Sequence, residues 1–196
     1  MSETIFIATA NRGKIAEFQQ MLTDKTIVSF VDTNFPSPEE TGLTFIENAL
    51  IKARFASEQT KLPALADDSG LVVPALQGEP GIYSARYAGE DGNHAANMAK
   101  LLEKMDNFPP EKRQAYFVCV LVYLQHAHDP MPLIAVGEMQ GRIHHHPQGQ
   151  GGFGYDPIFF LPEYQCTAAE IAPKLKNAIS HRGKALAILR EKLYGG

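Results

Sequence analysis

The sequence predicts an α/β protein in which helices enclose a β-sheet. Short runs rich in β-branched residues alternate along the chain with segments whose apolar residues recur at helical spacing, which is typical of α/β folds. The run Ala115–Gln125 is apolar at almost every position, as expected of a central strand buried on both faces. The chain shows neither an internal repeat nor a low-complexity tract, so we expect this organisation over its whole length.

The first part of the chain predicts two strands and two helices. Thr4–Ala10 is a buried strand that turns sharply into a helix, and Thr26–Val31 is a second strand. A proline-containing loop then leads to the second helix. Thr44 and Glu47 fit a capping box at its start, and Asn48 and Lys52 lie four apart away from its apolar face, free to point at a cleft.

The middle of the chain is dominated by short apolar runs and one long loop. Leu62–Ala66 and Leu71–Leu76 flank the acidic segment Asp67-Asp68-Ser69-Gly70. Residues 77–93 are rich in glycine and polar residues, so we expect a long surface loop there. A third helix over residues 95–105 ends before two consecutive prolines.

The last third predicts two more strands, a glycine-rich loop and a C-terminal helix. Leu133–Met139 and Pro157–Leu161 have strand character, and Gly149–Gly154 forms the loop between them. The final helix follows Ser180, which fits its N-cap position.

The composition is that of an ordinary globular protein. The chain has 196 residues, 44% of them hydrophobic and 20% charged, so we expect a single domain over residues 1–196 or one domain with a small lobe. The net charge of −4 comes without a basic run, and we therefore expect no binding to nucleic acid. No segment is apolar enough for a signal peptide or a membrane span, and Cys119 fits a buried, reduced thiol. We expect a cytoplasmic protein without a membrane partner.

The acidic pair Asp67-Asp68 is the first candidate for chemistry. Two carboxylates between apolar runs are costly to bury unless they are paired or bind a cation. A type I turn with aspartate and glycine is the alternative. We favour the functional interpretation.

Two further segments have residues suited to phosphate and metal. Thr9-Ala10-Asn11-Arg12-Gly13-Lys14 lies at a strand-to-helix turn, where backbone N–H groups favour an anion, although an ordinary turn would have the same pattern. It does not have the spacing of a Walker A loop. Glu39 and Glu40 lie before the second helix, and magnesium prefers such oxygen ligands.

Gly149–Gly154 matches the pattern G-x-G-x-x-G and raises a dinucleotide-binding alternative. That motif requires a helix to begin inside it, whereas Pro157 and a β-like segment follow here. A loop that lets Phe153 stack on a base fits better, and a core phenylalanine is the other possibility.

Two groups of cationic residues remain. His181 and Arg182 fall in the first turn of the last helix, where cations oppose the helix dipole and favour a ligand with negative or carbonyl oxygens. Surface charge is the alternative. His144-His145-His146 cannot all face one ion from a strand, so we expect a loop or strand edge there rather than a metal site.

The order of these segments resembles the inosine triphosphate pyrophosphatase family, whose members are also described as dITP/XTP pyrophosphatases. The matching stretches run from residue 9 to residue 185, and no motif position departs from the pattern. They are TANRGK, EETGLTFIENALIKA, ADDSGL, PGIYSAR, GGFGYDPIFF and KNAISHRGKA.

The resemblance implies an elongated mixed β-sheet flanked by helices, with two lobes around a central nucleotide cleft, and a homodimer. It also implies magnesium-dependent hydrolysis of ITP, dITP or XTP to the monophosphate and pyrophosphate, which would keep deaminated purines out of DNA and RNA. Asp68 would be the general base or a metal ligand that orients water, while Glu39, together with Glu40, would help to hold Mg2+. The implied substrate-binding residues are Thr9, Ala10, Asn11, Arg12, Gly13, Lys14, Lys52 and Ser69 for the phosphates, Phe153, Gly154, Tyr155 and Asp156 for base and sugar, and Lys176, His181 and Arg182 over the purine.

Two other functions remain open from the sequence. The alternative from a different class is a nucleotide-binding sensor without turnover. An oxidoreductase with a Rossmann loop at Gly149–Gly154 is the third possibility.

Overall fold

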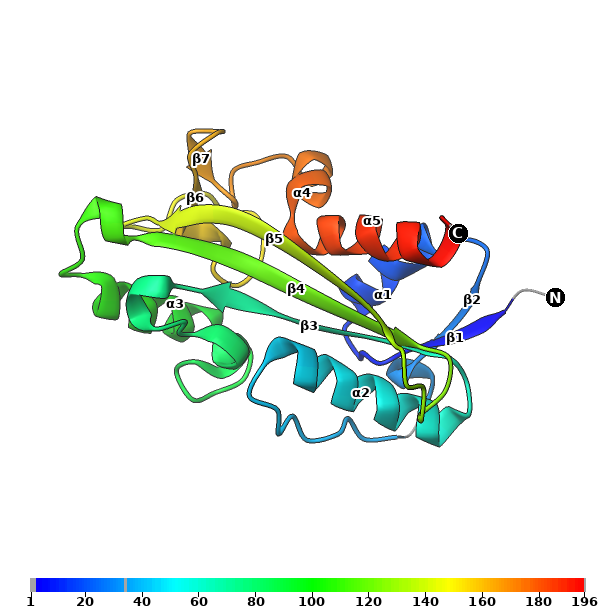
Figure 1. The fold of residues 1–196 in the computed structure, drawn as a ribbon. Helices are drawn as coiled ribbons and strands as arrows, with labels where there is room; N and C mark the ends of the chain where they lie inside the picture. Colours follow the sequence, from blue (N-terminus) through cyan, green and yellow to red (C-terminus); the bar gives the residue numbers. More distant parts are fainter. Residues whose placement is uncertain (1–2, 34, 196) are drawn as a thin grey trace. The chain divides into compact units, whose positions relative to one another are not determined.

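The computed structural model describes residues 3–33 and 35–195, and within them seven strands join in one mixed sheet (Figure 1). The order across the sheet is β2-β1-β3-β4-β5-β6-β7. β1 pairs in parallel with β2 and β3, whereas β5, β6 and β7 pair in antiparallel fashion. The strands are β1 (Thr4–Ile7), β2 (Thr26–Ser29), β3 (Ala64–Val72), β4 (Gln114–Leu124), β5 (Leu133–Ile143), β6 (Phe159–Leu161) and β7 (Cys166–Thr167). The prediction of an α/β fold with a mixed sheet and flanking helices is confirmed.

The helices begin and end at residues whose chemistry suits those positions. Asn11, Thr44 and Asn93 are the N-caps of the first three helices, each accepting a backbone N–H with its side-chain oxygen. The helices are α1 (Arg12–Met21), α2 (Phe45–Thr60), α3 (His94–Met105), α4 (Pro173–Ile179) and α5 (His181–Tyr194). Short 3₁₀ helices are η1 (Phe30–Asp32), η2 (Pro74–Leu76), η3 (Gly81–Arg86), η4 (Pro110–Lys112) and η5 (Asp156–Ile158).

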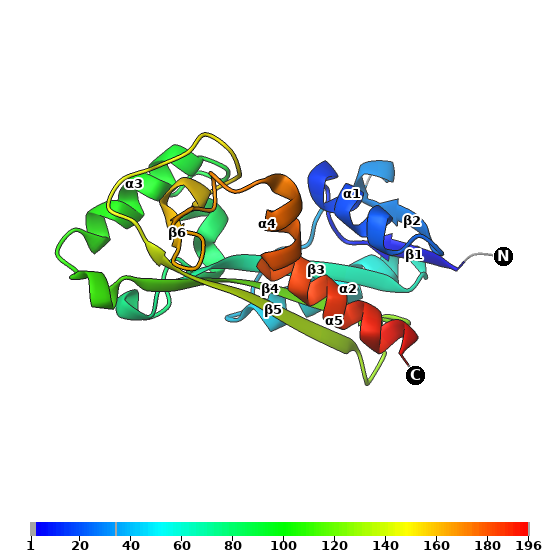
Figure 2. The ribbon, with the colours of Figure 1, turned by 90° about the horizontal axis from the view of Figure 1, so that it is seen from above.

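The chain divides into two compact units, each with its own hydrophobic core. Unit 1 comprises residues 1–68, 119–136 and 185–196, and unit 2 comprises residues 69–118 and 137–184. In unit 1, α1 lies alongside β1 and β2 (Figure 2). The core of unit 1 contains Ile5, Ile7, Phe18, Leu22, Leu65, Cys119, Leu121, Tyr123, Ala135, Ala185, Leu186 and Leu189. The single domain expected over residues 1–196 stays a prediction.

Unit 2 packs its core around α3, the first residues of β4, the last residues of β5, and β6. Its buried residues include Leu71, Leu101, Met105, Phe117 and Phe159. The buried Arg113 guanidinium donates hydrogen bonds to four backbone carbonyls, those of Met105, Phe108, Ile143 and His144. It therefore joins the end of α3 to the end of β5.

Several predicted elements are confirmed with shifted ends, and the structure also contains elements that the sequence did not predict. The predicted loop over residues 77–93 contains η3, which the polar composition did not indicate. α4 and β7 were not predicted, because seven and two residues are too short for a periodic pattern. No helix within the described residues is long and apolar enough to cross a membrane.

Candidate active site

Asp67 and Asp68 do not form a turn but lie inside β3, which runs without interruption from Ala64 to Val72. The type I turn considered for these residues is therefore wrong. Successive side chains of a strand point to opposite faces of the sheet. Each carboxylate has a lysine partner on its own side, Lys14 from α1 for Asp67 and Lys52 from α2 for Asp68. These two ion pairs offset the cost of placing adjacent carboxylates in a buried strand.

On the Asp67 side of β3, Lys14 forms an ion pair with the carboxylate. Lys14 Nζ lies 2.6 Å from Asp67 Oδ2, and the side chains are 22% and 1% exposed, respectively. Asn11 Oδ1 caps α1 by accepting from the backbone N–H groups of Gly13 and Lys14, at 2.9 and 3.2 Å. Two of the N–H groups that we expected to face an anion are thus already bonded, which leaves the side chains of Arg12 and Lys14 as the cations of this segment.

The Asp68 side of β3 gathers two carboxylates around one ammonium. Lys52 Nζ lies 2.9 Å from Glu40 Oε1 and 3.2 Å from Asp68 Oδ1, and all three residues belong to unit 1. Burial raises the pKa of the Asp68 carboxyl above its ordinary value, and the nearby Glu40 carboxylate raises it further against the effect of Lys52. Burial acts to lower the pKa of Lys52, but the carboxylates of Asp68, Asp67 and Glu40 outweigh it and raise that pKa.

One atom of this group is unsatisfied. Asp68 Oδ2 is buried, and no hydrogen-bond partner for it occurs among residues 3–33 and 35–195. A buried carboxylate oxygen without a partner is costly, and a bound cation would remove that cost. Two carboxylates also suit magnesium, which is usually held by one or two protein carboxylates, with waters and substrate phosphates as its other ligands. No larger cluster of histidine, cysteine and acidic side chains that could hold a metal occurs in the described part of the chain.

The loop that carries Glu40 is fixed to the start of α2. The buried Asn48 side chain accepts the Gly42 N–H at 2.8 Å, and Glu47 accepts the Leu43 N–H at 2.8 Å. A Cβ at Gly42 would lie 2.6 Å from the Glu47 Cβ and 2.7 Å from Asn48 Oδ1, so only glycine fits there. The structure brings Glu40 to Asp68 and Lys52, whereas Glu39 is exposed.

Unit 2 presents a second group, built on the glycine-rich loop. No helix begins in Gly149–Gly154, and the loop continues into η5 and β6, which dismisses a Rossmann motif. Asp156 is 4% exposed, and its carboxylate accepts hydrogen bonds from the Phe153 N–H and from Lys176 Nζ. These bonds fix the loop and leave the Phe153 ring 67% exposed.

The other predicted residues of unit 2 divide into buried supports and residues at a helix start. The Tyr155 ring is buried, and its hydroxyl donates to the Ser84 carbonyl at 2.9 Å. Tyr155 therefore anchors the loop in the core of unit 2. Ser180 Oγ accepts the Gly183 N–H at 3.0 Å, which confirms Ser180 as the N-cap of α5. The His181 ring stacks on Phe117 with centroids 5.0 Å apart, and Arg182 is the next residue of α5.

The remaining predicted residues lie at the edges of these groups. Thr9 accepts the Asn11 N–H at 3.2 Å, and Ala10 and Arg12 flank the α1 cap on its exposed side. Ser69 follows Asp68 in β3, and Gly154 has a φ of +63°, a conformation that favours glycine. His144–His146 lies in the loop after β5, as expected.

The expectation that Asn48 is free to point at a cleft is wrong, because its side chain is buried and accepts the Gly42 N–H. Sequence reasoning missed two residues, and the first is Gly42, to which it gave no role in fixing this loop. It also gave no role to His94, whose ring contacts Phe153 with centroids 4.2 Å apart. No spacing pattern relates residues 94 and 153, so only the fold reveals that contact.

These features define a class. In unit 1, lysines of two helices lie beside buried carboxylates of a strand, an arrangement suited to a phosphorylated ligand. In unit 2, an exposed aromatic ring in a loop tied to Lys176 through Asp156 is suited to a planar base.

Comparison with known proteins gives the family. The model of the Ham1 family matches residues 5–192. The chain is 57% identical to the dITP/XTP pyrophosphatase of Legionella pneumophila (strain Lens), covering 96% of this chain and 97% of the relative, and 54% identical to that of Escherichia coli (strain K12), covering 99% and 100%. The solved structure of a HAM1 protein from Coxiella burnetii superposes with a TM-score of 0.94 at 46% identity, covering 99% of this chain and all of that one. The chain belongs to the Ham1 family.

Proposed function

We propose that this protein hydrolyses nonstandard purine nucleoside triphosphates, namely ITP, dITP and XTP, to the monophosphate and pyrophosphate. The observation that carries the proposal is the buried Asp68 carboxylate, paired with Lys52 through one oxygen and unsatisfied at the other. The relatives named dITP/XTP pyrophosphatase, similar over nearly the full length of both chains, support the same activity.

The residues of unit 1 would act on the triphosphate. Asp68 and Glu40, with the exposed Glu39 as a weaker candidate, would hold Mg2+, which when bound stabilises negative charge on phosphate oxygens. Lys52 and Lys14 would add positive charge as the departing pyrophosphate becomes more negative. Asp68 would accept a proton from the attacking water or orient that water, and its raised pKa suits a base.

The residues of unit 2 would hold the base. The exposed Phe153 ring can stack on a purine, while Lys176, His181 and Arg182 can donate to the oxygen at its 6-position. Adenine has an amino donor at that position, which would leave the protein donors unpaired and so disfavour ATP. Guanine has the same oxygen, so its exclusion must depend on the 2-position. Such selectivity would remove deaminated purines from the nucleotide pool before polymerases use them.

A nucleotide-binding sensor without turnover is the rival function. It would use the same base-binding group but would not need a carboxylate with an unsatisfied oxygen beside a lysine. The missing helix in the glycine-rich loop argues against an oxidoreductase.

The test is a panel of nucleoside triphosphates with magnesium, scored for pyrophosphate. We expect rapid release from dITP, ITP and XTP and much slower release from ATP and GTP. A protein that releases no pyrophosphate from either dITP or XTP would contradict the proposal, and binding without release would favour the sensor.

We also infer from the family resemblance that the protein acts in the cytoplasm as a homodimer and binds neither membrane nor nucleic acid. The net charge of −4 is consistent with the last point. Light scattering coupled to size-exclusion chromatography would give twice the chain mass for a dimer, and the mass of one chain would contradict it.

A further inference from the structure

The exposed Phe153 ring contacts a neighbouring ring, that of His94. Its ring centroid lies 4.2 Å from that of His94, with an interplanar angle of 66°, and both residues belong to unit 2. Edge-to-face contacts of this kind stabilise one orientation of an aromatic ring relative to its neighbour.

The backbone around Phe153 does not by itself set the direction of the ring. Gly152 and Gly154, on either side of it, have φ values of +81° and +63°, and the surrounding segment has no regular secondary structure. Asp156 fixes the Phe153 backbone by accepting its N–H, but that bond does not set the direction of the ring. The backbone limits the possible rotamers of Phe153, and the contacts of the ring select among them.

The backbone of His94, in contrast, is fixed by hydrogen bonds around the start of α3. It is the first residue of α3, and the N-cap Asn93 accepts the Ala96 N–H at 3.1 Å. The buried Asn97, one turn further on, accepts the Ala88 N–H at 2.6 Å and donates to the Ala85 carbonyl at 2.9 Å. α3 is thereby tied to the segment that precedes it, and the His94 backbone N–H donates to Gly92 in that segment.

We propose that His94 is a positioning residue that holds the Phe153 ring in the orientation needed to stack on the purine base. The proposal rests on the proposed function, because it takes Phe153 to be the base-stacking residue. In this role His94 acts through the Phe153 ring and not on the reacting atoms. It acts by reducing the number of ring orientations that binding of the base would otherwise have to restrict.

Removal of the His94 ring should weaken base binding and leave the chemical step intact. For His94→Ala we expect the KM for dITP to rise about two- to tenfold, the range of one aromatic contact, while kcat stays within about twofold. His94→Phe retains a ring at this position and should restore a KM near that of the wild type. His145→Ala, which removes an exposed histidine elsewhere in unit 2, is the matched control and should change nothing.

A ligand without a base separates positioning from general damage. Inorganic tripolyphosphate, used as an inhibitor of dITP hydrolysis, should have the same inhibition constant for the wild type and for His94→Ala. An unchanged KM in His94→Ala would overturn the proposal, as would a parallel loss of tripolyphosphate inhibition, which would indicate disruption of the whole site. Thermal melting of each variant identifies any that fails to fold, and His94→Phe then decides by whether its KM matches that of the wild type.

Calorimetric binding of dIMP makes the outcome independent of turnover. If the wild type binds dIMP more tightly than His94→Ala but releases no pyrophosphate, the positioning role stands and the proposed enzyme activity fails. If the wild type turns over dITP and both proteins bind dIMP equally, the activity stands and the role of His94 is wrong. If the wild type neither binds dIMP nor releases pyrophosphate from dITP, both are wrong.

Discussion

At the scale of single residues, the adjacent carboxylates of β3 have different surroundings. Asp67 is almost completely buried against Lys14, whereas Asp68 shares Lys52 with Glu40 and keeps one unsatisfied oxygen. The first arrangement is a closed ion pair, and the second has capacity for a further ligand. We therefore infer that Asp68 carries the chemistry and that Asp67 holds Lys14 in place.

The first prediction concerns Asp68→Asn. The amide keeps the shape of the side chain but can neither accept the proton of water nor bind magnesium well, so pyrophosphate release from dITP should fall about 10²- to 10⁴-fold. Binding of dITP, measured by calorimetry, should persist. Asp91→Asn, at an exposed position, is the control. Retention of more than about half of the wild-type rate by Asp68→Asn would remove Asp68 from the mechanism.

The second prediction concerns the ion pair of Lys14 and Asp67. Lys14→Met leaves a buried carboxylate without its ammonium and should lower the free energy of unfolding by about 1–3 kcal/mol. The double variant Lys14→Met/Asp67→Asn should recover part of that loss, because the uncompensated charge is gone. Urea denaturation of the two single variants and the double variant measures the coupling. Strictly additive losses would show that the two side chains act independently.

At the scale of elements, the interleaving of strands and helices was predictable because periodic apolar patterns report burial directly. The continuity of β3 through Asp67 and Asp68 was not, since aspartate disfavours strands and its lysine partners lie 53 and 16 residues away in sequence. The sequence also could not distinguish Glu39 from Glu40. Two adjacent residues of the same type differ only in where the loop backbone directs their side chains.

The third prediction concerns the loop before α2. Gly42→Ala forces a Cβ to within 2.6 Å of the Glu47 Cβ, so the segment that carries Glu40 must move. We expect a loss of about 1–3 kcal/mol in stability and a higher magnesium concentration for half-maximal activity. Ser37→Ala, in the exposed part of the same segment, is the control. An unchanged magnesium dependence in Gly42→Ala would separate this loop from metal binding.

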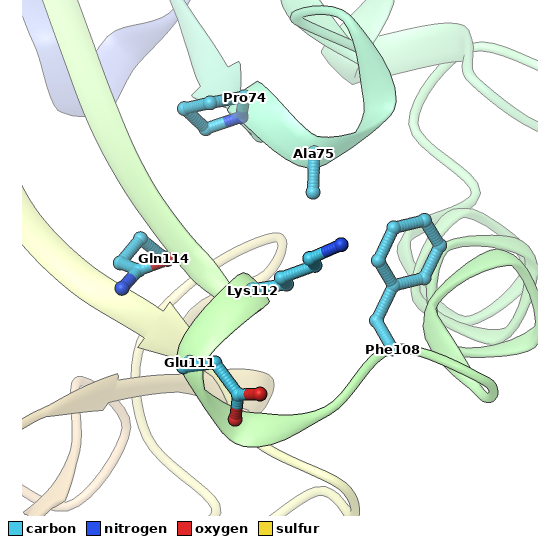
Figure 3. Close-up of a pocket in the computed structure, with 6 residues that line it drawn as sticks. All are labelled: Pro74, Ala75, Phe108, Glu111, Lys112 and Gln114. Carbon is cyan, nitrogen blue, oxygen red and sulfur yellow. The ribbon is translucent and has the colours of Figure 1, made fainter.

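At the scale of the whole molecule, the two units contribute different chemistry to one proposed reaction. Unit 1 has carboxylates and lysines suited to phosphate, and unit 2 has an exposed aromatic ring and, separately, His181 and Arg182 at the start of α5. Each unit has its own hydrophobic core. One open cavity of about 360 Å³ in unit 2 is lined by Pro74, Ala75, Phe108, Glu111, Lys112 and Gln114, none of which belongs to the proposed site (Figure 3).

The phosphorus atom that water attacks decides whether this assignment of residues is right. We would incubate the protein with dITP and magnesium in ¹⁸O-labelled water and follow the products by ³¹P NMR. Attack at the α-phosphorus predicts dIMP that carries the label, with unlabelled pyrophosphate as the other product. Orthophosphate as the primary product, or label in the pyrophosphate, would place the attack elsewhere and contradict the proposed roles of Asp68, Lys52 and Lys14.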